Sequence, residues 1–344
     1  MKALVKIKPE PGAVLQEMPT PVPGDTEILV KIKATALCKS DVDVVEWSPL
    51  VEASNPPLPL IMGHEFLGEV VEMGKSVKNI KIGDHITGET HIPCGYCYPC
   101  RNGNRHICSN NMGVLGRNVH GSFAEYVKIP EISAIKVDRS LPADQGSLLE
   151  PLATALHALS KGNVSGETVL ILGCGTIGLM AVELAKILGA TKVIALDIFQ
   201  NKLDAALKYG ADVVINGREA DLVEVVSGVT KGIGVGTVID TTGNQKVINS
   251  AVNAVRVAGT IVFVGMIDYP LTFDEFMHKV VYRELKLTGI FGRRFYETWD
   301  TVLKILESGR LDLAHYVGAE IKLEEYEKGL EIFPNTLGRV VMYP

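Results

Sequence analysis

Four of the six cysteines of this 344-residue chain fall within one short stretch, in the spacing C-x2-C-x2-C-x7-C. They are Cys94, Cys97, Cys100 and Cys108. Short loops of this kind bring thiolates to one point, as tetrahedral zinc with Zn–S bonds of about 2.3 Å requires. Because four sulfurs leave no open coordination position, zinc at such a site would be structural.

Three other uses of these cysteines remain open at this point. A disulfide ladder conflicts with the reducing compartment that follows from the lack of a recognisable signal peptide. An iron–sulfur cluster is compatible with the spacing. A nucleic-acid zinc module is disfavoured by the formal charge of −6 and by the scattered Lys and Arg residues. The closed four-cysteine zinc site is the preferred interpretation.

A second set of metal-binding side chains is dispersed along the first half of the chain. Its members are Cys38, His64, Glu65 and Glu150. Each alone is explained by burial or by a helix edge. Together, thiolate, imidazole and carboxylate form a plausible open zinc site. Zinc there would lower the pKa of an alcohol hydroxyl and prepare the alcohol for hydride transfer to nicotinamide.

A glycine motif, GCGTIG, follows the apolar run TVLIL directly, with Gly173, Gly175 and Gly178 at its fixed positions. A helical repeat comes next, and Asp197 ends the following strand about twenty residues on. The glycines let the backbone approach a pyrophosphate at a helix N-terminus. The Asp197 carboxylate can accept hydrogen bonds from the ribose hydroxyls of NAD. It would repel the 2′-phosphate of NADP, so NAD is favoured over NADP. The plain alternative is a glycine turn that caps a helix.

The spacing of apolar residues and turn residues divides the chain into three segments. These segments must position the candidate zinc ligands and the glycine motif. Residues 1–150 show short alternating runs and frequent turns, which predict irregular antiparallel β structure, for which a partly open barrel is one arrangement. Residues 166–290 alternate strand and helix, which predicts a doubly wound parallel sheet. After residue 291 an amphipathic helix and a final strand follow. The fold class is therefore α/β.

Composition limits the partners of the chain. No stretch approaches the roughly 18 apolar residues of a membrane span, and we expect neither a membrane nor a nucleic acid as partner. The N-terminal residues lack the apolar core of a signal peptide, so a cytoplasmic location is expected. The expected partners are a small-molecule alcohol and copies of the chain itself.

Taken together, these motifs resemble the zinc-dependent medium-chain alcohol dehydrogenases over essentially the full length. IMGHEF, the cysteine stretch and GIFGRRFYETW are most similar to a branch that contains L-threonine 3-dehydrogenases and their sorbitol and butanediol dehydrogenase relatives. The resemblance implies a GroES-like catalytic domain at 1–152, a Rossmann NAD-binding domain at 153–291 and a return to the catalytic domain at 292–344. It also implies one catalytic zinc, one structural zinc and a homotetramer.

The resemblance assigns roles residue by residue. Cys38, His64 and Glu65 match the catalytic zinc ligands, and Glu150 matches a nearby carboxylate that can enter or leave the shell. Ser40 matches the hydroxyl that takes the alcohol proton. The histidine that threonine dehydrogenases place near the substrate is matched by His91, for which a loop role is equally open. The positions that match NAD contacts are Gly173, Gly175, Ile177, Gly178, Asp197, Lys202, Val264, Gly265, Met266, Ile290 and Phe291.

One departure from the family pattern affects the predicted chemistry. The pattern is commonly Cys-Gly-Ser/Thr-Asp-x-His, whereas this chain reads CKSDVD, with Lys39 for the glycine and Asp43 for the histidine. A carboxylate with an ordinary pKa near 4 is a weaker proton acceptor than imidazole. The proton relay then runs through Asp43, through water, or by another route. LAHYVGAEI also lacks a Thr-His pair expected of threonine dehydrogenases.

The predicted function is NAD-linked oxidation of a secondary alcohol to a ketone. L-Threonine, giving 2-amino-3-oxobutanoate, is the first choice of substrate, and a polyol or vicinal diol is the alternative. A remote alternative is an NAD-binding sensor without catalysis.

Overall fold

The computed structural model describes all residues, Met1–Pro344, and the chain falls into two compact units. Unit 1 comprises Met1–Pro151, Gly292–Glu307 and Asp312–Pro344. Unit 2 comprises Leu152–Phe291 and Ser308–Leu311. None of the helices combines the length and the apolar composition that crossing a bilayer requires.

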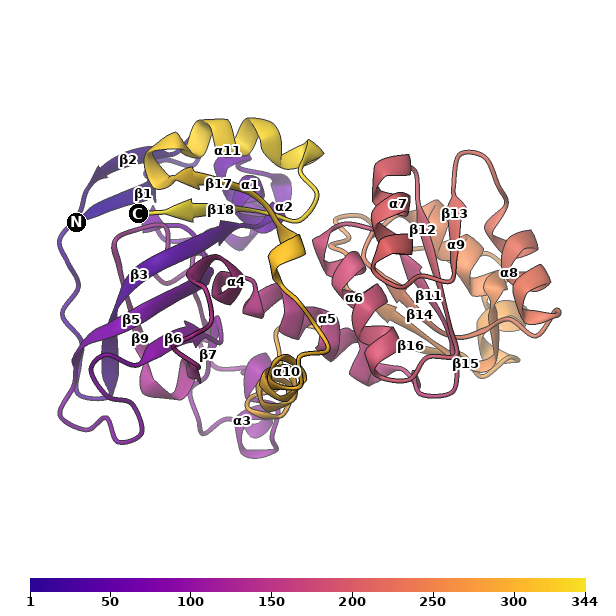
Figure 1. The fold of residues 1–344 in the computed structure, drawn as a ribbon, viewed down its shortest axis with the longest axis horizontal. Coiled ribbons are helices and arrows are strands. Elements are labelled where there is room, and N and C mark those ends of the chain that lie inside the picture. The colour runs from indigo at the N-terminus through magenta and orange to yellow at the C-terminus, as the bar shows by residue number, and fades with distance from the viewer. The chain divides into compact units, whose positions relative to one another are not determined.

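Unit 1 is built on a seven-stranded sheet with the order β10-β6-β5-β3-β18-β17, in which β9 also pairs with β3 (Figure 1). The long central strand β3 forms because its residues alternate, and Ile28, Val30 and Ile32 are buried against the core. A three-stranded sheet, β2-β1-β4, and a two-stranded pair, β7-β8, complete the strands. Their bounds are β1 Lys2–Lys6, β2 Val14–Glu17, β3 Glu27–Leu37, β4 Leu60–Ile61, β5 Glu65–Met73, β6 His85–Gly88, β7 His91–Ile92, β8 Gly113–Val114, β9 Tyr126–Pro130, β10 Ala134–Val137, β17 Val317–Lys322 and β18 Arg339–Tyr343.

The last strand of the chain, β18, lies inside this sheet between β3 and the edge strand β17. β18 pairs antiparallel with β3, with Val340 opposite Leu37 and Met342 opposite Thr35. Residues near the C-terminus therefore lie beside the end of β3, directly before Cys38. The helices of unit 1 are α1 Lys39–Glu46, α2 Pro49–Ser54, α3 Tyr98–Arg101, α4 Ala143–Ser147, the start of α5 Leu149–Lys161, α10 Glu297–Glu307 and α11 Tyr326–Ile332.

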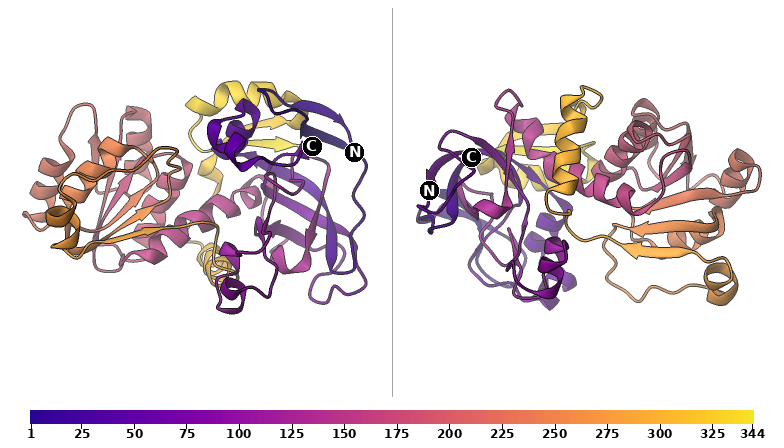
Figure 2. Two further views of the ribbon diagram at one scale, coloured as in Figure 1. Left: turned by 180° about the vertical axis from the view of Figure 1, so that it is seen from behind. Right: turned by 90° about the horizontal axis from the view of Figure 1, so that it is seen from below.

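Unit 2 contains a six-stranded, wholly parallel sheet with the order β13-β12-β11-β14-β15-β16 (Figure 2). Its strands are nearly continuous apolar runs, as expected where helices cover both faces. The order reverses between β11 and β14, the position at which doubly wound sheets bind ligands. The bounds are β11 Thr168–Leu172, α6 Thr176–Ile187, β12 Lys192–Asp197, α7 Gln200–Lys208, β13 Val213–Asn216, α8 Leu222–Thr230, β14 Val235–Asp240, α9 Gln245–Ala254, β15 Val255–Phe263, the π-helix Met277–Val281 and β16 Lys286–Gly289.

The glycine motif has the backbone that its sequence predicts. Gly173 leaves β11 with φ +88°, a left-handed conformation that glycine adopts without strain. A Cβ on Gly178 would lie 1.9 Å from the Gly173 carbonyl oxygen, so α6 packs closely on the turn only because this residue has no side chain. The predicted α/β fold class, with a β-rich unit and a doubly wound parallel sheet, is confirmed.

Candidate active site and metal centres

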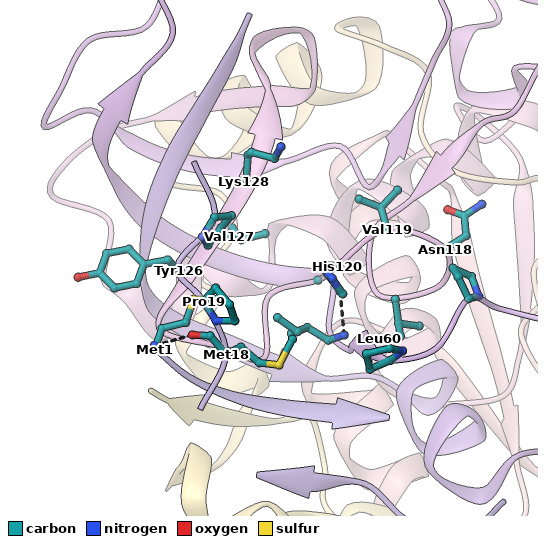
Figure 3. Close-up of a pocket in the computed structure, with 15 residues that line it drawn as sticks. Met1, Met18, Pro19, Leu60, Asn118, Val119, His120, Tyr126, Val127 and Lys128 are labelled. Atoms are coloured by element: carbon teal, nitrogen blue, oxygen red, sulfur yellow. Dashed lines mark hydrogen bonds between the residues drawn. The ribbon is translucent and has the colours of Figure 1, made fainter. Parts of the chain in front are cut away.

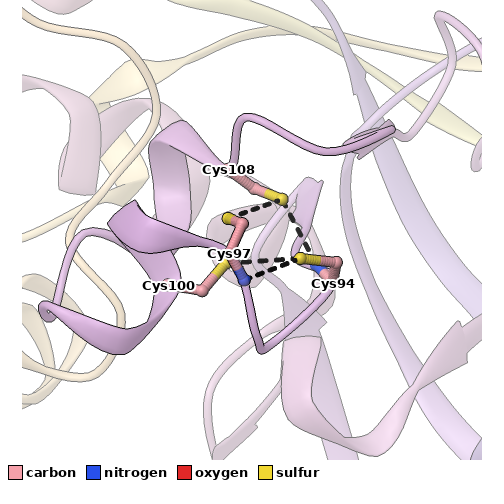
Figure 4. Close-up of side chains that lie close together, drawn as sticks. All are labelled: Cys94, Cys97, Cys100 and Cys108. Atoms are coloured by element: carbon pink, nitrogen blue, oxygen red, sulfur yellow. Dashed lines mark hydrogen bonds between the residues drawn. The ribbon is translucent and has the colours of Figure 1, made fainter.

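The four clustered cysteines meet at one point in the loop between β7 and β8 (Figure 4). The Cys94 and Cys100 sulfurs lie 4.0 Å apart, and those of Cys97 and Cys108 lie 3.7 Å apart. Tetrahedral zinc with bonds of about 2.3 Å separates its sulfurs by about 3.8 Å. The spacing therefore fits one zinc ion, and it is too wide for a disulfide. A multi-iron cluster would hold its cysteine sulfurs further apart, because more atoms separate them.

Backbone hydrogen bonds favour the thiolate form of Cys94 and Cys97, whereas burial and Cys97 raise the pKa of Cys100 to about 12. Burial would raise the pKa of Cys97, but backbone hydrogen bonds from Cys100 and Ser109 lower it to about 6. The Cys97 N–H in turn donates to the Cys94 sulfur at 3.4 Å. Since the thiolate is the form that binds zinc, these backbone hydrogen bonds favour metal binding by Cys94 and Cys97.

A second group brings together three of the four dispersed residues. Ligand atoms of Cys38, His64 and Glu65 all lie within 4.8 Å of one another, and their chemistry fits zinc. Cys38 caps α1, and Glu65 begins β5. Gly63 sets the approach to His64, because a Cβ at this position would lie 2.2 Å from the Phe123 ring. The predicted fourth member, Glu150, is outside this group.

Asp41 joins two of these ligands and was not assigned a role from the sequence. One carboxylate oxygen accepts from the Cys38 N–H at 3.0 Å, and the other lies 3.3 Å from His64 Nδ1. Burial disfavours the charged imidazole, but Asp41 and Cys38 raise the pKa of His64 well above its ordinary value. A carboxylate on Nδ1 fixes the ring orientation and makes the other nitrogen a better metal ligand.

Arg339, on β18, is the partner of Glu65. Its Nε and Nη2 donate to the two carboxylate oxygens at 2.8 and 2.7 Å, and Nη2 lies 3.8 Å from the Cys38 sulfur. Burial raises the pKa of Glu65, Arg339 opposes this rise, and the nearby charge of Glu150 adds to it. The sequence position of Arg339, 274 residues from Glu65, gave no local signal of this pairing.

The two residues that depart from the family pattern are paired with each other. Lys39 Nζ donates to Asp43 Oδ1 at 2.6 Å, one turn along α1. The Asp43 side chain is only 10% exposed, whereas that of Lys39 is 58% exposed. Ser40 is half-buried in the same turn, two residues after Cys38. Its predicted role as proton acceptor stays a prediction, as does the relay through Asp43.

Glu150 and His91 belong to a buried network centred on Arg293. The guanidinium, 2% exposed, donates through Nε and Nη2 to Glu89 at 2.9 and 2.6 Å, and through Nη1 to Glu150. His91 Nδ1 lies 2.8 Å from Glu89, and the Trp299 indole N–H donates to the same carboxylate at 3.0 Å. Neither Glu89 nor Arg293 was assigned a role from the sequence, although Arg293 lies in the GRRFYETW stretch that pointed to the threonine dehydrogenase branch.

The fully buried Glu89 makes the free energy of unfolding depend on pH. Burial alone would raise the pKa of Glu89, but Arg293 and His91 lower it from 4.5 to about 2. Because the folded pKa is the lower one, the stabilisation is complete above about pH 4.5 and is lost as pH falls toward 2. The shift corresponds to roughly 3 kcal/mol.

We therefore expect Glu89→Gln to unfold more easily than the wild type at pH 7, with a difference that shrinks below about pH 4.5. Urea unfolding followed by tryptophan fluorescence measures this in unit 1, where both tryptophans, Trp47 and Trp299, lie. Glu10→Gln, at an exposed glutamate, is the matched control. A difference that stays constant from pH 7 to 3 would contradict the expectation.

In unit 2 the predicted cofactor residues gather at one edge of the parallel sheet. Gly173 follows β11, Asp197 ends β12, Val264 follows β15 and Ile290 follows β16, so all lie at the carboxyl ends of strands. Met266 and Phe291, at the same edge, are 48% and 54% exposed. This edge, at the reversal of strand order, is where doubly wound sheets bind dinucleotides.

Asp197 is held by the glycine turn. Its Oδ2 accepts from the Cys174 N–H at 2.7 Å, and its Oδ1 accepts from the N–H groups of Ile198 and Phe199 at 2.7 and 3.1 Å. Lys202 lies over the Phe199 ring, 5.0 Å from its centroid. These bonds fix the carboxylate beside the motif, in the position expected for a ribose ligand.

A separate cavity of about 530 Å³ in unit 1 contains none of the predicted site residues (Figure 3). Its lining is mainly apolar, and the Ile61 N–H donates there to His120 Nδ1 at 3.2 Å. We assign the cavity no part in the reaction. Residues that line it include Met1, Met18, Leu60, Val119, His120 and Tyr126.

Comparisons with known families cover both units. Residues 24–139 match the alcohol dehydrogenase GroES-like domain, and residues 176–308 match the zinc-binding dehydrogenase family. These ranges include the two cysteine-containing groups and most of the sheet edge described above.

Individual relatives match along the full chain. An L-threonine 3-dehydrogenase of Caldanaerobacter subterraneus subsp. tengcongensis is 38% identical, with 100% of this chain and 99% of the relative covered. The crystal structure of 2R,3R-butanediol dehydrogenase from Bacillus subtilis has a TM-score of 0.89 at 26% identity, with 100% and 99% covered. An alcohol dehydrogenase of Escherichia coli CFT073 solved with NADH has a TM-score of 0.89 at 25% identity, with the same coverage.

Proposed function

The chain belongs to the zinc-binding dehydrogenases that carry an alcohol dehydrogenase GroES-like domain, and from this membership we propose that it oxidises L-threonine to 2-amino-3-oxobutanoate with NAD. The observation that carries the reaction type is the group of Cys38, His64 and Glu65, an open set of zinc ligands. The choice of threonine is supported by full-length similarity to a threonine 3-dehydrogenase.

When bound, zinc polarises the alcohol oxygen and NAD accepts the hydride. The chain itself holds the ligands and moves the proton. Asp41 orients His64, and Arg339 balances the charge of Glu65. Ser40 accepts the hydroxyl proton, and the relay continues toward the Lys39–Asp43 pair, of which Lys39 is exposed to solvent. His91 contacts the substrate, held in place by Glu89.

A polyol or vicinal diol is the second candidate substrate. It is favoured by the Lys39–Asp43 pair, which replaces the usual glycine and histidine, and by similarity to a butanediol dehydrogenase. NAD is favoured over NADP because the Asp197 carboxylate, held beside the glycine turn, would repel a 2′-phosphate. A homotetramer, expected from the resemblance, and a cytoplasmic location, expected from the N-terminal sequence, complete the proposal.

NAD reduction measured against L-threonine, sorbitol and 2,3-butanediol tests the proposal. We expect the highest kcat/KM with L-threonine, and a far lower value when NADP replaces NAD. Preference for a diol would transfer the assignment to the second candidate. Tight NAD binding without turnover of any alcohol would favour a sensor and reject the enzyme.

A further inference from the structure

We infer that Thr241 is a positioning residue for the glycine turn, and that Asp240 beside it holds the second cofactor loop at Val264–Gly265. Both residues lie at the carboxyl end of β14, within unit 2, and neither was assigned a role from the sequence. On this view the end of β14 sets the spacing between the two halves of the NAD site. The inference deepens the proposed function and rests on it for the binding of NAD.

The Thr241 side chain bonds the carbonyls that lead into the glycine turn. Its hydroxyl oxygen lies 2.8 Å from the Leu172 carbonyl oxygen and 3.2 Å from that of Gly173, so one hydroxyl hydrogen is shared between two acceptors. A Cβ on Gly173 would lie only 2.6 Å from the same hydroxyl. Because glycine prefers no single conformation, hydrogen bonds from its neighbours must hold the turn, and Thr241 donates one of them.

Asp240 is a fully buried carboxylate without a cationic partner. Its Oδ1 accepts from the N–H and the hydroxyl of Thr242 at 3.0 and 2.6 Å, and its Oδ2 accepts from the Gly243 N–H at 3.2 Å. Burial raises the pKa of Asp240, and these hydrogen bonds oppose the rise. A buried carboxylate costs free energy unless donors satisfy it, and such groups cluster at functional sites.

The backbone of Asp240 joins the second cofactor loop. Its carbonyl accepts from the N–H groups of Val264 and Gly265 at 2.8 and 3.0 Å. A Cβ on Gly265 would lie 2.3 Å from the Gly243 nitrogen, so the two loops are in direct contact. The Tyr269 hydroxyl donates to the Gly243 carbonyl as well. The carboxylate and the carbonyl of Asp240 therefore hold the two loops together.

Each residue serves a different half of NAD. The glycine turn is predicted to face the pyrophosphate, which NADH and ADP-ribose share, so loss of the Thr241 hydroxyl is expected to weaken both ligands. The Val264–Gly265 loop matches the nicotinamide half, which ADP-ribose lacks, so loss of the Asp240 carboxylate is expected to weaken NADH alone. In both cases a loosened loop must be ordered on binding, which lowers the apparent affinity.

Fluorescence titration with NADH, and displacement of NADH by ADP-ribose, test the role of Thr241. We expect Thr241→Val, which keeps the shape and removes the hydroxyl, to bind both ligands roughly 2–10-fold more weakly, the range of one lost hydrogen bond. The KM for NAD is expected to rise, with kcat at saturating NAD retained. Thr241→Ser keeps the hydroxyl and is expected to bind both ligands like the wild type.

Thr237 provides the matched control in the first half of the same strand. Its side chain is fully buried, and its hydroxyl donates to the Asn163 carbonyl at 2.7 Å. Thr237→Val is expected to lower stability, as Thr241→Val does, and to leave both affinities unchanged. Equal affinities in folded Thr241→Val and wild type, or an equal loss in Thr237→Val, would overturn the role of Thr241. Should Thr241→Val not fold, Thr241→Ala removes the hydroxyl without adding a methyl group and is expected to act in the same direction.

Asp240→Asn tests the second assignment, because an amide keeps the size of the side chain but offers one acceptor oxygen in place of two. We expect NADH to bind roughly 5-fold or more weakly, and ADP-ribose to bind like the wild type. A loss for both ligands alike, or for neither, would overturn the role of Asp240. Asp221→Asn, at a carboxylate that accepts from the Glu224 N–H at 2.9 Å, is the control and is expected to change neither affinity. Thr242→Val removes one donor to Asp240 and is expected to show the same split should Asp240→Asn not fold.

These outcomes are separable from those of the proposed function, because binding is measured without an alcohol. If the chain rejects L-threonine but both ligands respond as expected, the substrate assignment fails and the roles of Thr241 and Asp240 stand. If L-threonine is oxidised and the affinities do not respond, the reverse holds. A wild-type chain that binds neither NADH nor ADP-ribose would overturn both.

Discussion

Replacing Cys38 with serine is expected to lower kcat/KM for the alcohol by roughly a thousand-fold or more. A serine hydroxyl is a much poorer zinc ligand than a thiolate, and loss of the metal removes several kcal/mol of stabilisation of the developing charge. About 4 kcal/mol corresponds to roughly a thousand-fold in rate. Elemental analysis is expected to show about one zinc per chain instead of about two, and steady-state kinetics measures the loss of activity.

The Cys38→Ser variant should keep its affinity for NAD, because the predicted cofactor residues belong to unit 2. Fluorescence titration with NADH checks this, and tryptophan fluorescence checks that unit 1 is still folded. Unchanged turnover, or an unchanged zinc content with full activity, would refute the assignment of Cys38 as a ligand.

Replacing Cys100 with serine is expected mainly to lower the stability of unit 1. The four-cysteine site closes the loop from Cys94 to Cys108, and structural zinc contributes directly to folding. We expect unit 1, with about 200 residues, to lose about 4 kcal/mol or more, well within the ~10–16 kcal/mol of apparent zinc binding in finger peptides. The midpoint of thermal unfolding should then fall by roughly 8–16 °C.

The two cysteine variants control for each other. Both lose about one zinc per chain, but Cys38→Ser is expected to keep the unfolding midpoint of unit 1, and Cys100→Ser is expected to lower it. Tryptophan fluorescence during heating, with Trp47 and Trp299 as reporters, separates the two cases. A Cys100→Ser protein with wild-type stability would show that the cluster does not serve the fold.

Much of unit 2 could be predicted because its signals are local. The apolar run TVLIL, the glycines after it and Asp197 at the end of the next strand lie within about thirty residues of one another. Strand periodicity indicated a parallel sheet, and β11 to β16 form one. Family membership and the α/β fold class were likewise predicted correctly from these motifs and the cysteine spacing.

The partners of the site residues could not be predicted, because they come from distant parts of the chain. Arg339 reaches Glu65 only through the pairing of β18 with β3, and Arg293 reaches Glu89 across 204 residues. No periodicity encodes such contacts. Buried glutamates require cations as partners, but only a fold shows which glutamates are buried and which arginine pairs with each one. The roles of Ser40, Asp43 and His91 stay predictions.

The pairing of Lys39 with Asp43 has a consequence for how this chain can be altered. These two positions hold glycine and histidine in the common family pattern. Here they hold opposite charges 2.6 Å apart, with Asp43 nearly enclosed. Replacing Lys39 alone with glycine leaves the enclosed Asp43 carboxylate without its ion-pair partner. Replacing Asp43 alone with histidine sets an imidazole beside the Lys39 ammonium group. The two sites are therefore epistatic, and a histidine relay can be grafted onto this helix only by changing both in one step.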